Sequence, residues 1–280
     1  MYTEISFPSL GLTLNPPRGL EIGSFSIYYY GIIIALGMVL AVFYATRRSK
    51  EFGIREDDLL DGVLWVTPFA IVCARAYYCI FTWENYAENP LSVFNIREGG
   101  LAIYGGVLGA AVGVAVFCKV RKIRLTALLD LAALGFLMGQ SIGRWGNFFN
   151  REAFGAETAS FLRMGLMNRY TGQVTYYHPT FFYESVWNAA GFLLLHRFSK
   201  KRQYDGQIAL LYAAWYGLGR TFIEGLRTDS LYLGPFRVSQ LLAAISCVAA
   251  LSVLVYRMRK EQDPAKLYVN VVAEKEANEE

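Results

Sequence analysis

The chain has 280 residues, of which 54% are apolar, 15% are aromatic and only 18% are charged. A soluble domain usually carries about 25% charged residues, so this composition argues against an ordinary soluble globular protein. The net charge is +4, and the basic residues form no tract with nucleic-acid character, so no nucleic-acid partner is expected. Apolar runs of about 18 residues or more recur, long enough to cross a bilayer core of roughly 30 Å. The composition therefore predicts an all-α, polytopic transmembrane protein.

In chain order, about seven candidate spans appear. They cover residues 26–46, 59–81, 99–118, 126–149, 178–198, 206–226 and 236–256. Basic clusters follow alternate spans, as TRRSK, KVRKIR, KKR and YRMRK. Lys and Arg are enriched in cytoplasmic loops, so these clusters are assigned to the cytoplasmic side. The N-terminus is then predicted outside and the C-terminus in the cytoplasm.

The remaining segments predict a simple domain plan. Residues 1–257 form the membrane domain, in which 151–177 is the longest external connection and a candidate for a small external head. Residues 258–280 form a polar cytoplasmic tail, either disordered or a short helix. The cysteines lie in apolar segments without C-x-x-C spacing, and there are only two histidines, so we expect no disulfide, metal or cofactor site.

Ionisable residues inside membrane spans are costly and are usually paired or functional. In this chain they are Arg75, Asp130, Arg144, Glu184, Arg220 and Glu224. With the predicted topology, all except Asp130 lie roughly 3–9 Å below the outer surface, as do Tyr30 and Tyr104. This agreement indicates one polar cavity in the outer leaflet. Asp130 lies near the cytoplasmic end and is interpreted as a helix N-terminal or packing residue.

Helical phase groups these residues further. Two stripes share a face at three- and four-residue spacing: Gln140, Arg144 and Asn147, and then Tyr216, Arg220, Glu224 and Arg227. Arg220 and Glu224 are spaced to pair along one helix. Snorkelling explains a single arginine near an interface, but not the polar residues that share its face. Arg75, Arg144 and Arg220 against Glu184 and Glu224 leave a positive pocket, which favours an anionic phospholipid.

The segment GRWGNFFNREAFG, Gly143 to Gly155, closely resembles the signature of the bacterial prolipoprotein diacylglyceryl transferases, G-R-x-G-N-F-x-N-x-E-x-x-G. Further blocks resemble the family in the same order: YYGIIIALG, CARAYY, GGLAIYGGVLG, HPTFFYES, YGLGRTFIEGLRTD and VSQLLA. The resemblance covers about residues 20–257.

This resemblance implies an enzyme, a phosphatidylglycerol–prolipoprotein diacylglyceryl transferase. Such enzymes move the diacylglyceryl group of phosphatidylglycerol onto the thiol of the lipobox cysteine of a prolipoprotein. A thioether forms and glycerol-1-phosphate leaves, in the first step of lipoprotein maturation. The implied partners are phosphatidylglycerol, prolipoprotein signal peptides and the lipid bilayer. The implied location is the bacterial cytoplasmic (inner) membrane, with the active site facing the outer leaflet.

By resemblance, Arg144 binds the lipid headgroup with Asn147, and Arg220 stabilises the departing phosphate. Tyr104 completes the catalytic set; many members carry histidine at its position, so a histidine-base mechanism does not transfer. A phosphate oxygen or a glutamate is the alternative acceptor of the thiol proton. Further substrate-binding candidates are Tyr30, Arg75, Asn150, Glu152, Gly155, Tyr216, Glu224 and Arg227. Glu152, Glu224 and Arg227 are expected to orient the binding groups; Glu152 alternatively caps the start of the external loop.

Two other function classes remain as alternatives. A transporter or flippase for an anionic lipid or solute requires a polar path through the membrane. Apart from Asp130, the inner halves of the spans are apolar, which disfavours this alternative. A purely structural membrane scaffold has no need for a shared arginine pocket. The sequence therefore favours the transferase.

Overall fold

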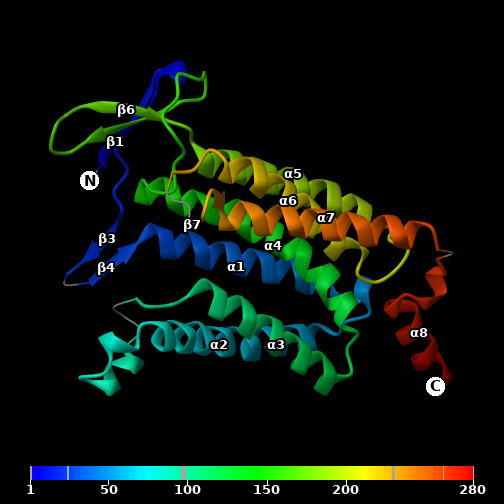
Figure 1. Cartoon of the computed structure of the whole chain (residues 1–280). Coiled ribbons are helices and arrows are strands. Elements are labelled where there is room, and N and C mark those ends of the chain that lie inside the picture. The colour runs from blue at the N-terminus through cyan, green and yellow to red at the C-terminus, as the bar shows by residue number, and fades with distance from the viewer. Residues whose placement is uncertain (1, 24, 96–98, 229–230, 261, 280) are drawn as a thin grey trace. The chain divides into compact units, whose positions relative to one another are not determined.

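The structure is a computed structural model that describes the chain apart from residues 1, 24, 96–98, 229–230, 261 and 280 (Figure 1). Its helices are α1 (Tyr29–Arg48), α2 (Glu56–Phe81), α3 (Ile103–Arg121), α4 (Leu125–Asn150), α5 (Thr180–Ser199), α6 (Gln207–Glu224), α7 (Val238–Met258) and α8 (Tyr268–Glu279). Its strands are β1 (Tyr2–Phe7), β2 (Leu12–Leu14), β3 (Gly19–Ile22), β4 (Phe25–Tyr28), β5 (Met164–Asn168), β6 (Val174–Tyr177), β7 (Tyr232–Leu233) and β8 (Phe236–Arg237).

Each predicted span coincides with one of the helices α1 to α7, within a few residues at either end. Within the described ranges, five helices are long and apolar enough to cross a membrane: α1 with the turn that follows it, α2, α3, α4 and α7. The protein is therefore a mostly helical chain with the character of a multi-pass membrane protein. Helices α5 and α6 fall outside this set because they carry many polar and aromatic side chains, among them Glu184, Asn188 and Arg220.

The chain forms two compact units, and the first comprises residues 1–44 and 130–264. In this unit α4, α5, α6, α7 and most of α1 run alongside one another (Figure 1). Small residues bring α1 and α4 close together: a Cβ added to Gly37 would lie 3.3 Å from the carbonyl oxygen of Gly139. Close backbone approach at small residues is the usual basis of helix packing in membranes.

A four-stranded antiparallel sheet in the order β2-β1-β5-β6 forms the head of the first unit. Ile5 of β1 pairs with Leu166 of β5, and both pack with Met164 against Phe148 of α4 and Phe181 of α5. The head therefore rests on the ends of two helices. The all-α prediction omits these strands, and the predicted head of 151–177 omits the N-terminal half of the sheet. Short strands that pair across most of the chain leave little local signal.

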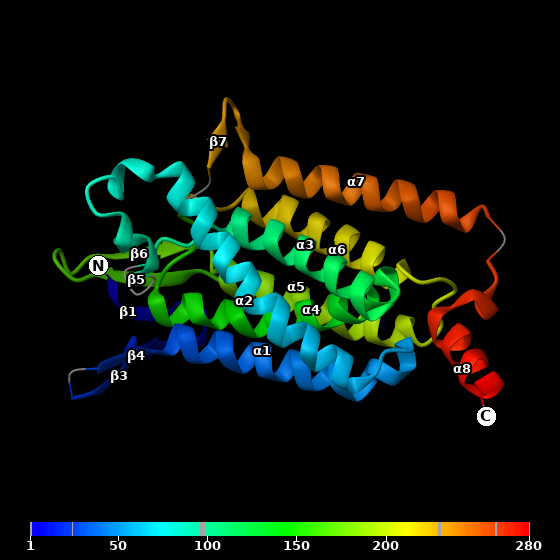
Figure 2. The same cartoon turned by 90° about the horizontal axis from the view of Figure 1, so that it is seen from below.

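The second unit comprises residues 45–129 and 265–280. Its main feature is the packing of α2 against α3, which Figure 2 shows from below. The C-terminal segment, predicted as a disordered tail or a short helix, forms α8. Gly53 has φ +72° and touches α8 so closely that an added Cβ would lie 2.8 Å from Cα of Val269. The Arg124 guanidinium also lies over the Tyr268 ring, 5.5 Å from its centroid.

Asp130 of α4 is fully buried and caps the neighbouring helix α6. Its two carboxylate oxygens accept hydrogen bonds from the backbone N–H groups of Gly206 and Ala209, each at 2.8 Å. The first N–H groups of a helix have no partner within the helix, and a side-chain oxygen supplies one. Asp130 thus serves the N-terminus of α6, which refines the predicted helix-terminal or packing role.

Asp130→Ala is expected to lower the stability of the detergent-solubilised protein by about 1–2 kcal/mol, the usual cost of losing a helix cap. Thermal unfolding followed by circular dichroism measures the effect, with Glu84→Gln at an exposed site as the control. Equal melting temperatures for Asp130→Ala and the wild type would contradict the capping role.

Candidate active site

The centre of the site is the Glu184 carboxylate, which two arginines from different helices approach. Arg144 Nη2 of α4 lies 2.5 Å from Glu184 Oε2, and Arg220 Nη1 of α6 lies 2.9 Å from Glu184 Oε1. Glu184 lies on α5, so this single side chain links three helices. Charge-assisted hydrogen bonds of this length are among the strong polar contacts in proteins.

Glu224 and Arg227 extend this arrangement into a cluster of five charged side chains, here called the arginine–glutamate cluster. Arg220 Nη2 lies 2.6 Å from Glu224 Oε2, which confirms the predicted pairing along α6. Arg227 lies 3.7 Å from Glu184 and 3.9 Å from Glu224. Three arginines against two glutamates give the cluster a formal charge of +1. The predicted set counted Arg75 as the third arginine, whereas the third arginine of the observed cluster is Arg227.

The arginines are the accessible members of the cluster. The side chains of Glu184 and Glu224 are 4% and 2% exposed, whereas that of Arg144 is 22% exposed. Arg220 and Arg227 are 16% and 12% exposed. Because the arginine side chains are more exposed than the two carboxylates, positive charge is the more accessible part of the cluster. The arrangement can bind an anion, and planar guanidinium groups suit phosphate.

The signature segment continues the polar network at the end of α4. Arg144 Nη1 approaches Asn147 Oδ1 at 3.5 Å, and Asn147 Nδ2 donates to Glu152 Oε1 at 3.1 Å. Asn150 Nδ2 donates to the same Glu152 oxygen at 3.2 Å. Glu152 therefore orients both asparagine amides.

Gly155 closes the loop that follows the signature. Its N–H donates to the His178 carbonyl at 2.9 Å, and it forms a β-bridge with Arg227. A Cβ at Gly155 would lie 2.8 Å from both His178 Cβ and the Leu226 carbonyl oxygen. The structure thus gives this glycine a close-packing role that brings the signature loop against the chain that carries Arg227.

Two predicted tyrosines pack in the first unit. Tyr30 of α1 lies against Gly146 of the signature, where an added Cβ would approach its ring to 2.7 Å. Tyr216 of α6 stacks on Tyr212, with ring centroids 5.8 Å apart, and the Tyr212 hydroxyl accepts a hydrogen bond from Gln140 at 2.9 Å. Tyr30 therefore packs against α4, which supplies Arg144, and Tyr216 lies on α6, which supplies Arg220.

Arg75 lies in the second unit, where its guanidinium organises a loop. All five of its N–H groups have backbone acceptors at 2.7–3.0 Å: the carbonyls of Ser92, Val93, Asn95, Gly99 and Gly100. Gly100 has φ +77°, and a Cβ there would collide with the guanidinium. Arg75 is 7% exposed, so its observed contacts are those of a structural residue.

Tyr104 also lies in the second unit, in the first turn of α3, and its side chain is 44% exposed. The next residue, Gly105, packs directly against Tyr77 and the backbone of α2. Gly105 is therefore required for α2–α3 packing, while Tyr104 itself is open to contact.

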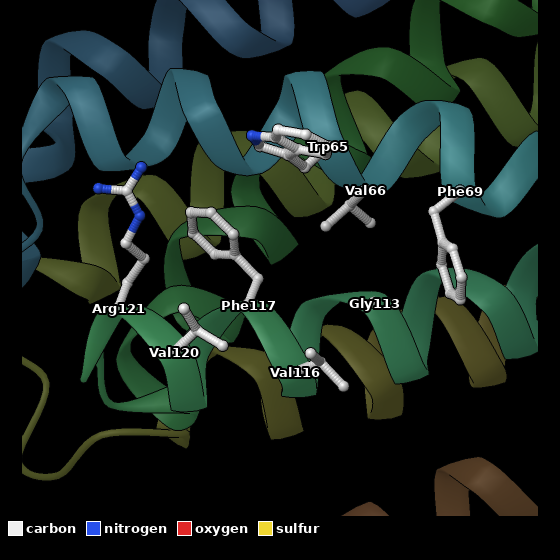
Figure 3. A pocket seen from close by; sticks show the side chains of 8 residues that line it. All are labelled: Trp65, Val66, Phe69, Gly113, Val116, Phe117, Val120 and Arg121. Atoms are coloured by element: carbon white, nitrogen blue, oxygen red, sulfur yellow. The ribbon is translucent and has the colours of Figure 1, made fainter.

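A cavity of about 290 Å³ between α2 and α3 has a different chemistry (Figure 3). Trp65, Val66, Phe69, Gly113, Val116, Phe117 and Val120 line it, and Arg121 stands at one end. Arg121 is paired with Asp61 and, at 3.3 Å, with Asp58. The groove is mostly apolar and suits hydrocarbon, and the charged residue that lines it, Arg121, is paired with two aspartates.

Comparison with known proteins gives a consistent result. A family model described as prolipoprotein diacylglyceryl transferase matches residues 17–256. Proteins named phosphatidylglycerol–prolipoprotein diacylglyceryl transferase are 43% identical in Bacillus cytotoxicus, 44% in Bacillus cereus and 45% in Bacillus anthracis. Each alignment spans 249 residues, 87% of this chain and 92% of the relative. The chain belongs to the prolipoprotein diacylglyceryl transferase family.

The sequence pattern places most of the cluster among the site residues, but it places Glu184 only in the polar cavity and assigns it no catalytic or binding role. Its only signal was a carboxylate at the same depth as the arginines. Because α4, α5 and α6 are separate in sequence, their spacing does not show that one glutamate contacts Arg144, Arg220 and Arg227.

The contacts of Arg75 generate a prediction. Arg75→Lys is expected to loosen the segments 92–95 and 99–100, because an ammonium group has three donors for their five carbonyl acceptors. Limited proteolysis and thermal unfolding should both reveal the loosening. Arg259→Lys, at an exposed site after α7, is the matched control. Unchanged proteolysis of these segments would contradict the structural role.

Proposed function

We propose that this protein transfers the diacylglyceryl group of phosphatidylglycerol to the lipobox cysteine of prolipoproteins. The observation that carries the proposal is the pair Arg144 and Arg220, both held on one buried carboxylate while their own side chains are 22% and 16% exposed. Family membership supports the choice of substrates.

In the proposed reaction the cysteine sulfur attacks the glycerol carbon that is esterified to the phosphate. The new carbon–sulfur bond forms as the carbon–oxygen bond breaks, and glycerol-1-phosphate leaves with the bonding electrons. Negative charge grows on the leaving phosphate, so preorganised cations lower the barrier. Arg144 and Asn147 bind the headgroup, and Arg220 stabilises the departing phosphate. Glu224 and Arg227 hold Arg220 in place, and Glu152 orients the asparagines.

The substrate supplies the nucleophile, whose ordinary thiol pKa is about 8.5. Tyr104 is a poor base at neutral pH because a tyrosine hydroxyl has a pKa of about 10. We assign its exposed hydroxyl to hydrogen bonding with the headgroup or the thiol. The proton then passes to a phosphate oxygen or to a glutamate carboxylate.

The proposal includes a topology of seven spans, with the N-terminus outside, the C-terminus in the cytoplasm and the head external. Arg144 lies six residues from the end of α4 at 150, and Glu184 and Arg220 each lie four residues from a helix end, at 180 and 224. At 1.5 Å per residue these positions are about 6–9 Å inside the helix ends, a depth that suits a phospholipid phosphate. The proposed location is the outer leaflet of the bacterial cytoplasmic membrane.

The test uses purified protein, phosphatidylglycerol labelled in its headgroup glycerol, and a synthetic lipobox peptide. Labelled glycerol phosphate should be released in the presence of the peptide. Arg144→Gln should lower kcat/KM by about 100- to 1,000-fold, the usual cost of losing one donor to a developing anion. Arg259→Gln, at the far end of α7, serves as the arginine control and should retain activity.

Two further arms of this assay examine the chemistry. A peptide with serine in place of the cysteine should give no release, because the hydroxyl is a far weaker nucleophile at neutral pH. Tyr104→Phe tests the hydroxyl: a rate near that of the wild type would remove Tyr104 from the mechanism. Release that is independent of the peptide cysteine would overturn the transferase proposal.

A further inference from the structure

A reciprocal pair of tryptophans joins α5 to α6. The indole Nε1–H of Trp187 donates to the Trp215 carbonyl at 3.0 Å, and that of Trp215 donates to the Trp187 carbonyl at 3.0 Å. The two rings stack with their centroids 4.4 Å apart and their planes 19° from parallel. Backbone carbonyls inside a helix already accept one bond, so each indole uses a second lone pair of its acceptor.

Two glycines make room for this pair. Gly219 of α6 lies beneath the Trp187 ring, and Gly191 of α5 lies beneath the Trp215 ring. A Cβ at either position would collide with the indole that covers it. The W-x-x-x-G pattern therefore occurs once on each helix, at Trp187–Gly191 and at Trp215–Gly219. Stacking, two hydrogen bonds and two close contacts together fix how far one helix can slide along the other.

A second reciprocal pair joins α5 to α4. Ser141 Oγ donates to the Ser185 carbonyl at 2.9 Å, and Ser185 Oγ donates to the Ser141 carbonyl at 2.8 Å. Trp145 Nε1 donates to Ser185 Oγ at 3.1 Å from the same side. Interhelical hydrogen bonds of this kind stabilise helix packing in membranes.

Both pairs lie directly beside Glu184. Ser185 is the next residue on α5, and Trp187 is three residues along. On the partner helices, Ser141 is three residues before Arg144, and Gly219 immediately precedes Arg220. A slide of one residue moves a helix by about 1.5 Å, a shift more than half as long as the ion pairs of 2.5 and 2.9 Å, and it would change their geometry.

We propose that the Trp187–Trp215 pair, together with the Ser141–Ser185 pair, is a positioning device for the transfer reaction. The two pairs hold α5 in register between α4 and α6, so that Glu184 sets the separation of the Arg144 and Arg220 guanidinium groups. We expect that separation to let both arginines contact one phosphate. These tryptophans and serines are positioning residues, and the inference rests on the proposed function.

The experiment compares two substrates within one protein preparation: phosphatidylglycerol and its analogue with sulfur in place of a non-bridging phosphate oxygen. Sulfur is a weaker hydrogen-bond acceptor, so well-placed guanidinium groups discriminate against it. Trp187→Phe and Trp215→Phe keep an aromatic ring and lose one N–H each. Each should reduce the oxygen-to-sulfur ratio of kcat/KM several-fold, and Ser141→Ala should act in the same direction.

The ratio separates positioning from general destabilisation, because a smaller folded fraction lowers both rates equally. Trp83→Phe, just after α2 at a residue that is 54% exposed, is the matched control and should keep the wild-type ratio. An active wild type whose ratio is unchanged by the three variants would refute the positioning role alone. A wild type that releases no glycerol phosphate would refute the proposed function and the positioning role with it.

Discussion

The site depends on one electrostatic constraint: a carboxylate buried within a helical bundle must be neutralised by close cations. Glu184 meets this requirement through Arg144 on one side and Arg220 on the other. Removing one partner of a buried ion pair typically lowers the stability of a protein by about 3–5 kcal/mol. The carboxylate and the two arginines therefore hold one another in position. The arginines are more exposed than the carboxylates, and we propose that the same interaction prepares a site for an anion.

The rest of the first unit supports this constraint. The head sheet packs through Ile5 and Leu166 onto Phe148 of α4 and Phe181 of α5, the two helices that carry Arg144 and Glu184. Asp130 caps the N-terminus of α6, whose C-terminal half carries Arg220. Gly155 brings the signature loop against the segment that carries Arg227. A polar cluster among apolar helices is costly to build, and these contacts hold its members in one arrangement before any substrate arrives.

Much of this arrangement is predictable from the sequence, because hydropathy and helical spacing are local. The helix positions and the Arg220–Glu224 pair both follow from them. The contacts of Glu184 with Arg144 and Arg220 are not predictable in this way, because they depend on which helices become neighbours. The sheet between β1 and β5 is missed for the same reason. Arg75 shows the converse. The sequence predicts it in the polar cavity, but its guanidinium donates all its N–H groups to backbone carbonyls of its own unit.

The most direct test of the central claim is the binding of glycerol phosphate, followed by ³¹P NMR. If Arg144 and Arg220 form one phosphate site, Arg144→Gln and Arg220→Gln should each weaken binding about tenfold, or roughly 1.4 kcal/mol. The double variant should lose less binding free energy than the sum of the two single losses, because both substitutions damage the same site. Binding that is unchanged by either substitution, or losses that add fully, would contradict a single site built on Glu184.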